Sequence, residues 1–273
     1  MEKSDRLPLI IVRGGGDIAT GTIHRLVSCG LPVLVLEAKQ PSAIRRQVAF
    51  SEAVYEKEIT IEGKKAVLIN QLEEWQAVSE KGDIPVLTDE AGEAIALLKP
   101  DIVIDAILAK KNLGTDKEMA PLTIALGPGF TAGEDVDVVI ETMRGHNLGR
   151  IIREGSAMPN TGIPGVIAGV GKERVIHAPC EGTVCVIHGI GEIVRKDETI
   201  AMIGDVEVRA TISGIIRGMI KDRYPVTKGF KIADIDPRIE ELNNCYTISD
   251  KARCIAGSVL EVVCEYIFKR KMG

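Results

Sequence analysis

Short apolar runs alternate with helically spaced apolar residues over the first half of the chain. Residues 9–12 form an apolar run that stops at Arg13 and a glycine triplet, and apolar residues then recur at helical spacing up to Gly30. This order predicts a strand, a glycine turn and a helix closed by a glycine. Further strands are predicted at 33–36, 85–87 and 102–104, with helices at 71–80 and 90–98. Strands that alternate with helices predict a parallel, doubly wound α/β sheet.

Three more strand patterns complete this first region. Residues 58–69 carry two apolar or alternating runs around a Glu62-Gly63 turn, which predicts a β-hairpin added to the sheet. Strands at 122–126 and 136–140 are separated by a second glycine turn. We therefore expect residues 1–150 to form a Rossmann-like nucleotide-binding domain, followed by a Gly/Pro-rich connector at 151–172.

An internal repeat follows the connector. The segment Ala178-Pro-Cys-Glu-Gly-Thr-Val184 recurs 32 residues later as Ala210-Thr-Ile-Ser-Gly-Ile-Ile216, and the same offset relates 200–203 to 232–235. Two units of short β-strands predict a flattened β-barrel over residues 173–240. The register resembles the barrel-sandwich hybrid of biotinyl and lipoyl carrier domains. The joining segment 204–209 has no Lys, so we expect neither biotin nor lipoate.

The last region, 241–273, has apolar residues at helical spacing from 255 to 267. This pattern predicts a C-terminal helix that packs back on the first domain. The expected fold class is therefore α/β, with a Rossmann-like parallel sheet domain, a small all-β barrel-sandwich hybrid domain and a C-terminal helix.

Composition narrows the classes of function. The chain has 273 residues, is 45% hydrophobic and carries 34 basic against 39 acidic residues, a net charge of −5. Such a chain buries a sizeable core, and its charge disfavours a nucleic-acid partner. It has 28 Gly but only one Trp, four Tyr and four Phe, so it has few aromatic faces for stacking.

Cysteine usage and hydropathy indicate the compartment. The six Cys residues form no C-x-x-C pair, no signal peptide is evident, and His177 and His188 have no partner at metal-ligand spacing. We expect reduced thiols, no metal site and no membrane span, and hence a cytoplasmic protein.

The first glycine loop is the clearest candidate for ligand binding. Gly14, Gly15 and Gly16 end a predicted strand and lead into a helix, so backbone N–H groups and the positive end of the helix dipole would face an anion. The loop departs from G-x-G-x-x-G, since Ala19 stands at the third glycine position. Asp17 would repel a phosphate unless it turns aside to cap the helix. The alternative is a tight turn that binds nothing.

Charged residues after the second strand extend this candidate site. Glu37 ends that strand, about 20 residues beyond the glycine loop, at the place where a dinucleotide fold positions the acid that binds ribose hydroxyls. Arg45 and Arg46 follow and are candidates for contact with a phosphate or a pterin-like anion. The alternative is that these charges solvate a loop.

A second group of candidates follows later strands and is expected at the same carboxyl edge of the sheet. The loop Gly127-Pro128-Gly129 comes directly after a strand, and Asp105 ends another. Asp105 is the candidate for catalysis, with a role as a turn former as the alternative. Lys110, Asn112, Glu141, Arg144 and His146 are expected to face the same crevice.

Five motifs, at residues 12–21, 43–55, 127–133, 141–149 and 159–165, taken together resemble those of a known family. The chain is similar to the YqeB-type selenium-dependent molybdenum hydroxylase system proteins, and the similarity covers nearly its whole length. That resemblance implies a pathway, because the family is named for genes that neighbour selenium-requiring molybdenum hydroxylases. The motifs are Val12-Arg-Gly-Gly-Gly-Asp-Ile-Ala-Thr-Gly21, Ala43 to Tyr55, Gly127-Pro-Gly-Phe-Thr-Ala-Gly133, Glu141-Thr-Met-Arg-Gly-His-Asn-Leu-Gly149 and Pro159-Asn-Thr-Gly-Ile-Pro-Gly165.

The nucleotide-binding part is also similar to the XdhC/CoxF maturation factors, which handle the molybdenum cofactor of xanthine dehydrogenase-type enzymes. Those proteins carry a cysteine-bearing region before the nucleotide-binding part, whereas this chain reaches its first strand by Leu9. We therefore do not expect cofactor-sulfuration chemistry to transfer.

Three functional hypotheses follow. The first is a maturation protein that binds a nucleotide or molybdopterin-type cofactor, with a molybdenum hydroxylase or its maturation machinery as partner. The second is an NAD(P)-dependent oxidoreductase that resembles the dehydrogenase domain of sirohaem synthases. The third is a non-catalytic scaffold. Whether the chain is an enzyme and whether it forms a homo-oligomer stay open at this stage.

Overall fold

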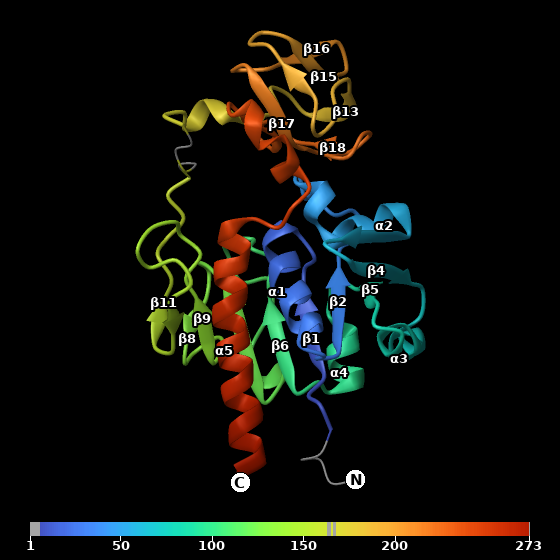
Figure 1. Ribbon diagram of the computed structural model, residues 1–273, viewed down its shortest axis with the longest axis vertical. Coiled ribbons are helices and arrows are strands. Elements are labelled where there is room, and N and C mark those ends of the chain that lie inside the picture. Colours follow the sequence, from blue (N-terminus) through green and yellow to red (C-terminus); the bar gives the residue numbers. More distant parts are fainter. Residues whose placement is uncertain (1–5, 163–164, 166–167, 273) are drawn as a thin grey trace. The chain divides into compact units, whose positions relative to one another are not determined.

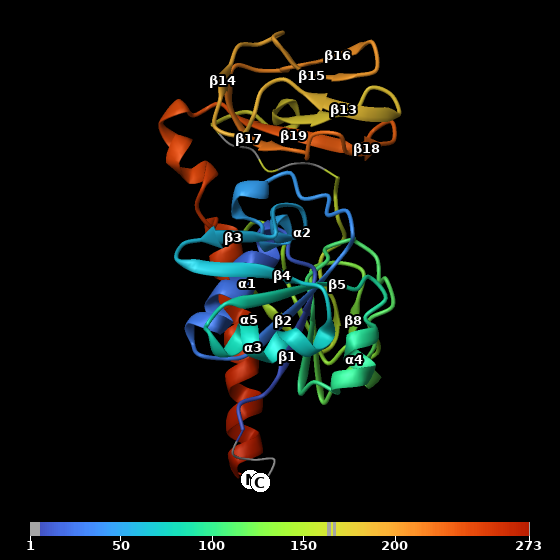
Figure 2. The ribbon, with the colours of Figure 1, turned by 90° about the vertical axis from the view of Figure 1, so that its right-hand side faces the viewer.

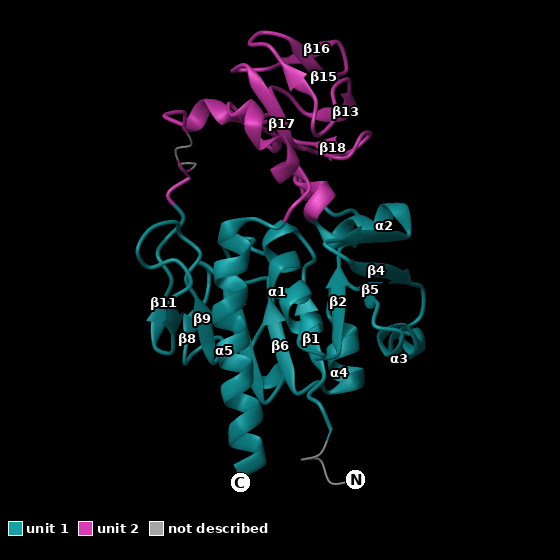
Figure 3. Cartoon of the chain, viewed as in Figure 1, with its two compact units in different colours: residues 1–41, 49–160, 248–273 teal, residues 42–48, 161–247 magenta. Residues whose placement is uncertain are grey.

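The computed structural model describes residues 6–162, 165 and 168–272 (Figure 1). Part of the predicted connector, residues 163–164 and 166–167, lies outside the described residues. The chain divides into two compact units, and each is built from separate stretches (Figure 3). Unit 1 contains 1–41, 49–160 and 248–273, and unit 2 contains 42–48 and 161–247. The predicted segments were each continuous along the chain.

Unit 1 is built on a mixed sheet, which has nine strands in the described part of the chain. Its central strands are parallel, while β3 and β10 at the two edges pair antiparallel with their neighbours. The order across the sheet is β10 (Ile151–Ile152), β9 (Val138–Ile140), β7 (Leu122–Leu126), β6 (Ile102–Asp105), β1 (Ile10–Arg13), β2 (Val33–Glu37), β5 (Ile84–Thr88), β4 (Lys64–Ile69) and β3 (Glu58–Ile61).

The fold class predicted for this region was wrong. A Rossmann-like parallel sheet was expected, and the structure has a large mixed sheet with an antiparallel strand at each edge. A buried strand carries the same apolar run whichever way its neighbour runs, so strand direction could not be taken from the runs. Direction follows from the connections, since a tight turn forces antiparallel pairing, as at the 58–69 hairpin.

Helices cover both faces of this sheet. The helices α1 (Asp17–Ser28) and α5 (Asp250–Met272) lie side by side on one face, and the short helices α3 (Trp75–Glu80) and α4 (Glu93–Leu98) lie on the other (Figures 1 and 2). Along β1, Ile10 and Val12 enter the core beneath α1 and α5, and Ile11 enters the opposite core. This alternation follows from the two-residue period of a strand.

The contact between α1 and α5 is close. A Cβ atom placed on Gly21 of α1 would lie 2.8 Å from the Cβ of Ala252 in α5. Small residues at this crossing let two helix backbones approach, so the last helix of the chain becomes part of the first unit's core. The remaining short elements of unit 1 are η2 (Phe50–Glu52), α2 (Ala53–Glu56), η3 (Leu72–Glu74), η4 (Lys117–Met119), β8 (Thr131–Ala132) and β11 (Gly155–Ser156).

Unit 2 consists mainly of two antiparallel sheets, each with four strands among the described residues. The first has the order β12 (Val175–His177), β19 (Lys231–Asp236), β17 (Gly214–Met219) and β14 (Ile193–Val194). The second has the order β16 (Val206–Arg209), β15 (Thr199–Ile203), β13 (Gly182–Val186) and β18 (Pro225–Val226). The short helices η1 (Arg46–Val48), η5 (Lys172–Arg174) and η6 (Ile239–Cys245) complete the unit.

The prediction of a barrel-sandwich hybrid for this region was also wrong in its stated form, because the strands form two separate four-stranded sheets among the described residues. The 32-residue offset is visible in the strands, since β13 and β15 correspond to β17 and β19. Each sheet takes strands from both copies. The repeated apolar positions fix which residues enter the core but leave open how the strands close around it.

A seven-residue segment from the first half of the chain belongs to unit 2. Ile44 packs against the apolar core of that unit, and its carbonyl accepts a 2.8 Å hydrogen bond from the N–H of Met219. The segment is joined to unit 1 at both ends. Unit 2 therefore depends on residues more than a hundred positions away in the sequence from its main body.

Candidate functional site

The first glycine loop links β1 to α1 at the carboxyl edge of the unit 1 sheet. Gly14 has a φ of +94°, and a Cβ there would lie 2.9 Å from the carbonyl oxygen of Ala106. A Cβ on Gly15 would lie 2.9 Å from the backbone nitrogen of Ser51. These two positions need glycine because neighbouring backbone packs directly against them.

Gly16 differs from the two glycines before it. It is the N-cap of α1 with a φ of −63° and a ψ of 179°, a conformation open to any residue. Among the described residues, no atom lies within 4 Å of a Cβ built on it. Its missing side chain leaves the first turn of α1 without a side-chain cap from the N-cap residue.

Glu37 ends β2 and is tied to this loop. Its Oε2 accepts a 2.6 Å hydrogen bond from the N–H of Gly15, and its Oε1 accepts one of 2.8 Å from the N–H of Ala38. Burial raises the pKa of the Glu37 carboxyl, and the nearby Glu90 adds to the rise. The sequence placed Glu37 correctly at the strand end, but its carboxylate holds the glycine loop itself.

Asp105 ends β6 opposite Arg13 of the neighbouring strand β1. Its side chain is only 2% exposed and accepts hydrogen bonds from the Thr115 hydroxyl at 2.6 Å and the N–H of Ile107 at 3.1 Å. The guanidinium of Arg13 in turn donates to the Thr115 oxygen at 2.6 Å. Burial raises the pKa of the Asp105 carboxyl. These bonds give Asp105 the role of a turn former inside a buried network.

The second glycine loop also lies at the carboxyl edge, after β7. Gly127 has a φ of +81°, and a Cβ there would meet the Oγ1 of Thr142 at 2.6 Å. Gly129 has a φ of +110°, with the backbone nitrogen of Lys111 2.7 Å from the position of a Cβ. Pro128 between them is half-buried. The glycines of this loop allow close packing of neighbouring chain.

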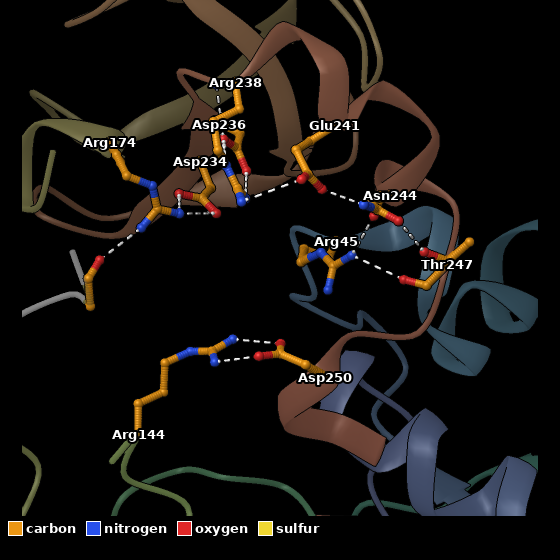
Figure 4. A network of polar contacts seen from close by, with 11 residues as sticks. Arg45, Arg144, Arg174, Asp234, Asp236, Arg238, Glu241, Asn244, Thr247 and Asp250 are labelled. Atoms are coloured by element: carbon orange, nitrogen blue, oxygen red, sulfur yellow. Dashed lines mark hydrogen bonds and ion pairs between the residues drawn. The ribbon is translucent and has the colours of Figure 1, made fainter. Parts of the chain in front are cut away.

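Glu141 follows β9 at the same edge and is 2% exposed. Its two oxygens accept hydrogen bonds from the N–H groups of Met143 at 2.7 Å and Met158 at 2.8 Å. Arg144 forms a two-pronged ion pair with Asp250 at the start of α5, with distances of 2.7 and 2.8 Å (Figure 4). Of the other candidates in this region, Lys110 and His146 are exposed, and Asn112 closes its own turn onto Thr115.

Arg45 and Arg46 lie in unit 2, whereas the glycine loop lies in unit 1. Arg45 is 8% exposed and donates to the carbonyl oxygens of Asn244 and Thr247 at 3.1 and 3.3 Å (Figure 4). Arg46 donates to the carbonyl of Met219 at 3.0 Å. Both therefore bind backbone of their own unit, a role that adjacency to the second strand did not indicate.

Unit 2 contains a buried ion pair of its own. Arg174 donates two hydrogen bonds to Asp234, at 2.8 and 3.0 Å, and both side chains are under one tenth exposed (Figure 4). Nearby on the same strand, Asp236 is bound by Arg238, whose hydrogen bonds lower the pKa of Asp236 against the opposing effect of burial. Burial raises the pKa of the Cys245 thiol, which disfavours a reactive thiolate there.

A shallow groove on unit 1 lies between α1 and α5 and is lined by Gly21, His24, Arg25, Ser28, Ile248 and Arg253. Arg253 forms an ion pair with Glu62 at 2.6 Å, and a ring nitrogen of His24 lies 3.2 Å from the Glu62 carbonyl. The hydrogen bonds from Ile248 and Arg253 lower the pKa of Glu62, although burial opposes them. The contacts of Glu62 thus join α1 and α5 to the 58–69 hairpin.

Two residues at the sheet edge were missed in the sequence. Thr20 accepts a 2.9 Å hydrogen bond from the N–H of Phe50 and donates to the carbonyl of Gly16 at 2.9 Å, so it holds the glycine loop against residues 50–51. Lys251, the second residue of α5, is half-buried near Asp17 and Glu141. Nothing in the sequence pattern showed that the last helix begins at this edge.

Two kinds of feature are absent from the described ranges. No group of three or more His, Cys, Asp or Glu side chains there is arranged to hold a metal ion. None of the helices described combines the length and the apolar character that crossing a membrane requires.

Comparison with known proteins gives one strong match. The chain is 48% identical over 255 residues, 93% of its length, to "Uncharacterized protein YqeB" of Escherichia coli (strain K12). It spans about half the length of this relative, 47%. Similarity to YqeB, inferred from the motifs, is thereby confirmed, and the relative's name states no reaction. No family model matches the chain.

Solved structures give only distant neighbours. An aspartoacylase family protein from Mesorhizobium loti is 12% identical with a TM-score of 0.28, covering 84% of this chain and 85% of that one. A succinylglutamate desuccinylase/aspartoacylase from Rhodobacter sphaeroides is 15% identical with a TM-score of 0.27 and covers 84% and 85%. Likeness at this level carries no argument about chemistry.

Proposed function

We propose that this chain is an accessory protein of a selenium-dependent molybdenum hydroxylase system that binds a phosphate-bearing pterin or nucleotide at the carboxyl edge of the unit 1 sheet. The observation that carries the proposal is the open start of α1 at Gly16. Similarity to YqeB over 93% of the chain supports the choice of system. The partner in this proposal is a molybdenum hydroxylase or its maturation machinery.

The start of α1 suits an anion for two reasons. The helix is 12 residues long, so its aligned peptide dipoles place a partial positive charge at Gly16. The N–H groups of the first turn lack intrahelical partners, and no side chain of the N-cap residue reaches them. A phosphate oxygen is the group that such donors bind best.

The hydrogen bonds of Glu37 favour a ligand that is held by its phosphate over one that is held by its ribose hydroxyls. An acid that selects a nicotinamide dinucleotide receives hydrogen bonds from ribose hydroxyls. Both oxygens of Glu37 already accept backbone hydrogen bonds at 2.6 and 2.8 Å. These bonds tie Glu37 to the loop, so its place at the strand end is explained without the ribose contact that motivated the dehydrogenase alternative.

The state of Asp105 favours binding over catalysis. A general acid or base must reach the proton that it transfers. Asp105 is 2% exposed, and its oxygens accept hydrogen bonds from Thr115 and Ile107. A protein that carries or presents a cofactor needs no such group.

The test compares the wild-type protein with Gly16→Asp and Gly16→Asn. Both side chains fit, because no described atom lies within 4 Å of a Cβ at this position. Asp and Asn are good N-caps, so both variants should fold and gain roughly a few tenths of a kcal/mol in helix stability. Only Asp places a negative charge in front of the N–H groups.

We expect mass spectrometry of the native protein to find a co-purifying phosphate-bearing pterin or nucleotide. Calorimetry with inorganic phosphate as the probe should show at least about tenfold weaker binding to Gly16→Asp than to Gly16→Asn. Equal binding by both variants would remove the α1 site from the proposal. A purified molybdenum hydroxylase that is not retained by the immobilised full chain would remove the proposed partner.

A further inference from the structure

We propose that Lys251 is the cationic ligand-binding residue of this edge, and that it contacts the phosphate or carboxylate group of the bound molecule. This inference rests on the proposed function, since it supplies a second contact for the same anion. The position is the second residue of α5, on a helix that packs against α1 where Gly21 meets Ala252. The starts of α1 and α5 therefore lie at the same sheet edge.

Lys251 is placed where a cation is costly. It stands in the first turn of α5, where the helix dipole disfavours positive charge. Its side chain is also half-buried. Burial lowers the pKa of the Lys251 ammonium, the charge of Arg144 lowers it further, and Asp17, Glu141 and Asp250 oppose the shift.

Two of the carboxylates around Lys251 are bound to other groups. Asp250 is paired with Arg144, and both oxygens of Glu141 accept backbone hydrogen bonds. The influence of Asp17, Glu141 and Asp250 on Lys251 is coulombic, and its ammonium donates no hydrogen bond to a residue in the described part of the chain. A half-buried ammonium that donates no hydrogen bond to these carboxylates still has its donors available to a ligand.

Four charged groups on neighbouring elements act on the ammonium, and their combined charge limits which ligands can bind. Asp17 comes from α1, Glu141 and Arg144 from the chain after β9, and Asp250 from α5. Asp250 neutralises Arg144, so Lys251 and the two helix starts are what attract an anion, while the carboxylates of Asp17 and Glu141 limit how much negative charge can enter. This balance favours one phosphate or carboxylate group over a polyphosphate chain.

Pyridoxal phosphate provides a test that does not require the natural ligand. Its aldehyde carbon is attacked by a neutral lysine amine, water leaves to give an imine, and borohydride then delivers hydride to the imine carbon while solvent protonates the nitrogen. Pyridoxal is the matched control, with the same aldehyde and no phosphate. Peptide mass spectrometry of the full chain reports the modification of each lysine, and exposed Lys110 serves as the internal reference.

We expect pyridoxal phosphate to modify Lys251 at least tenfold faster than pyridoxal does, with no such preference at Lys110. Inorganic phosphate should protect Lys251, and Gly16→Asp should reduce its modification. Modification of Lys251 at the same rate by both aldehydes, no modification of Lys251, or no protection by phosphate, would each overturn the proposal.

Two variants separate this proposal from the function on which it rests. Lys251→Met should keep or raise the stability of the fold and bind inorganic phosphate at least tenfold more weakly, and Lys251→Arg should restore binding. If Lys251→Met binds phosphate normally while Gly16→Asp does not, Lys251 has no role and the proposed site stands. If both variants bind normally, the proposed site itself is wrong. A loss of stability in Lys251→Met would mark a structural role and also overturn the inference.

Discussion

A carboxylate at the end of a buried strand can bind a ligand or fasten the loop that follows it. Glu37, Asp105 and Glu141 all take the second course, because each accepts hydrogen bonds from backbone N–H groups of nearby loops. Charge-assisted bonds of this kind are among the stronger ones in proteins. At this edge these three acids shape the loops, and the ligand contacts that we propose are the N–H donors of α1 and the ammonium of Lys251.

Residue type and position after a strand were enough to find Gly14, Gly15, Gly16 and Glu37 in the sequence. They did not show what Glu37 binds, since that depends on where the Gly15 N–H points. Arg45 and Arg46 were assigned to the ligand because they follow the second strand, but they bind backbone of unit 2. Short sequence distance is a weak guide where the chain passes between units.

Replacement of Glu37 by Gln should change how stability depends on pH. Burial raises the pKa of Glu37 above its ordinary 4.5, so between these two values the folded state binds more protons than the unfolded state. The contribution of Glu37 to stability is therefore full below the ordinary value and is lost as pH rises through the folded pKa. We expect the unfolding free energy of the wild type, relative to Glu37→Gln, to fall as pH rises above 4.5.

Urea unfolding of both proteins at a series of pH values between acid and neutral measures this difference. Glu73→Gln, at an exposed carboxylate, is the matched control for removing a charge. A wild-type minus Glu37→Gln difference that stays constant across the series, or that rises with pH, would contradict the assignment.

At the scale of elements, apolar periodicity located most central strands to within a residue or two, as at β2, β6 and β7. The hairpin pattern predicted the antiparallel pairing of β3, but the direction of the other edge strand, β10, was not given, because pairing direction depends on connections and not on which residues are apolar. Apolar periodicity also left the packing partner of α5 open, since an apolar stripe shows that a helix is covered without showing by what. Here the partner is α1, admitted by Gly21 and Ala252.

Two helical glycines on these elements should respond to alanine in opposite directions. At Gly21 a Cβ would lie 2.8 Å from both the Cβ and the carbonyl oxygen of Ala252, so Gly21→Ala must push α5 away. We expect a loss of about 1–3 kcal/mol in unfolding free energy. At Gly257 the nearest atom is the flexible end of Arg25 at 3.6 Å, so Gly257→Ala should gain about 0.5–1 kcal/mol from higher helix propensity.

Denaturant unfolding of the two single variants and the double variant checks this pair. The matched chemistry separates the close approach of the helices from helix propensity in general. Two losses of equal size would show that α5 tolerates no extra methyl group anywhere along α1. Two gains would show that the helices are not in close contact at Gly21.

At the scale of the whole molecule, each unit is completed by a segment distant in the sequence. Residues 42–48 supply Ile44 and two arginines to unit 2. Residues 248–273, which follow unit 2 in the sequence, belong to unit 1. The sequence pattern predicted that the last helix packs on the first domain, and its buried residues lie in the core with β1 and α1. Apolar periodicity did not predict that residues 42–48 belong to unit 2, because a short segment without regular spacing gives no signal of where it packs.

This arrangement makes unit 1 dependent on the last residues of the chain. In α5, Ile255, Val259, Val262 and Val263 are each at most 2% exposed. Burying one such side chain contributes about 1.5–3 kcal/mol, so the four together approach the roughly 5–15 kcal/mol by which typical domains are stable. Protein shortened to residues 1–247 should therefore have an unfolded unit 1, seen as loss of hydrogen-exchange protection in β1, β2 and β6. Residues of unit 2 keep their own core and should stay protected.

A synthetic peptide of residues 248–273 added to the shortened protein should restore protection in β1, β2 and β6. The same peptide with Ile255→Asp and Val259→Asp should not, because it would bring two charges into the core beneath α5. Restoration by the charged peptide would mean that α5 acts through its ends and not through its apolar face. If the shortened protein keeps full protection without any peptide, α1 alone covers this face of the sheet and α5 serves chiefly to present Lys251 at the carboxyl edge.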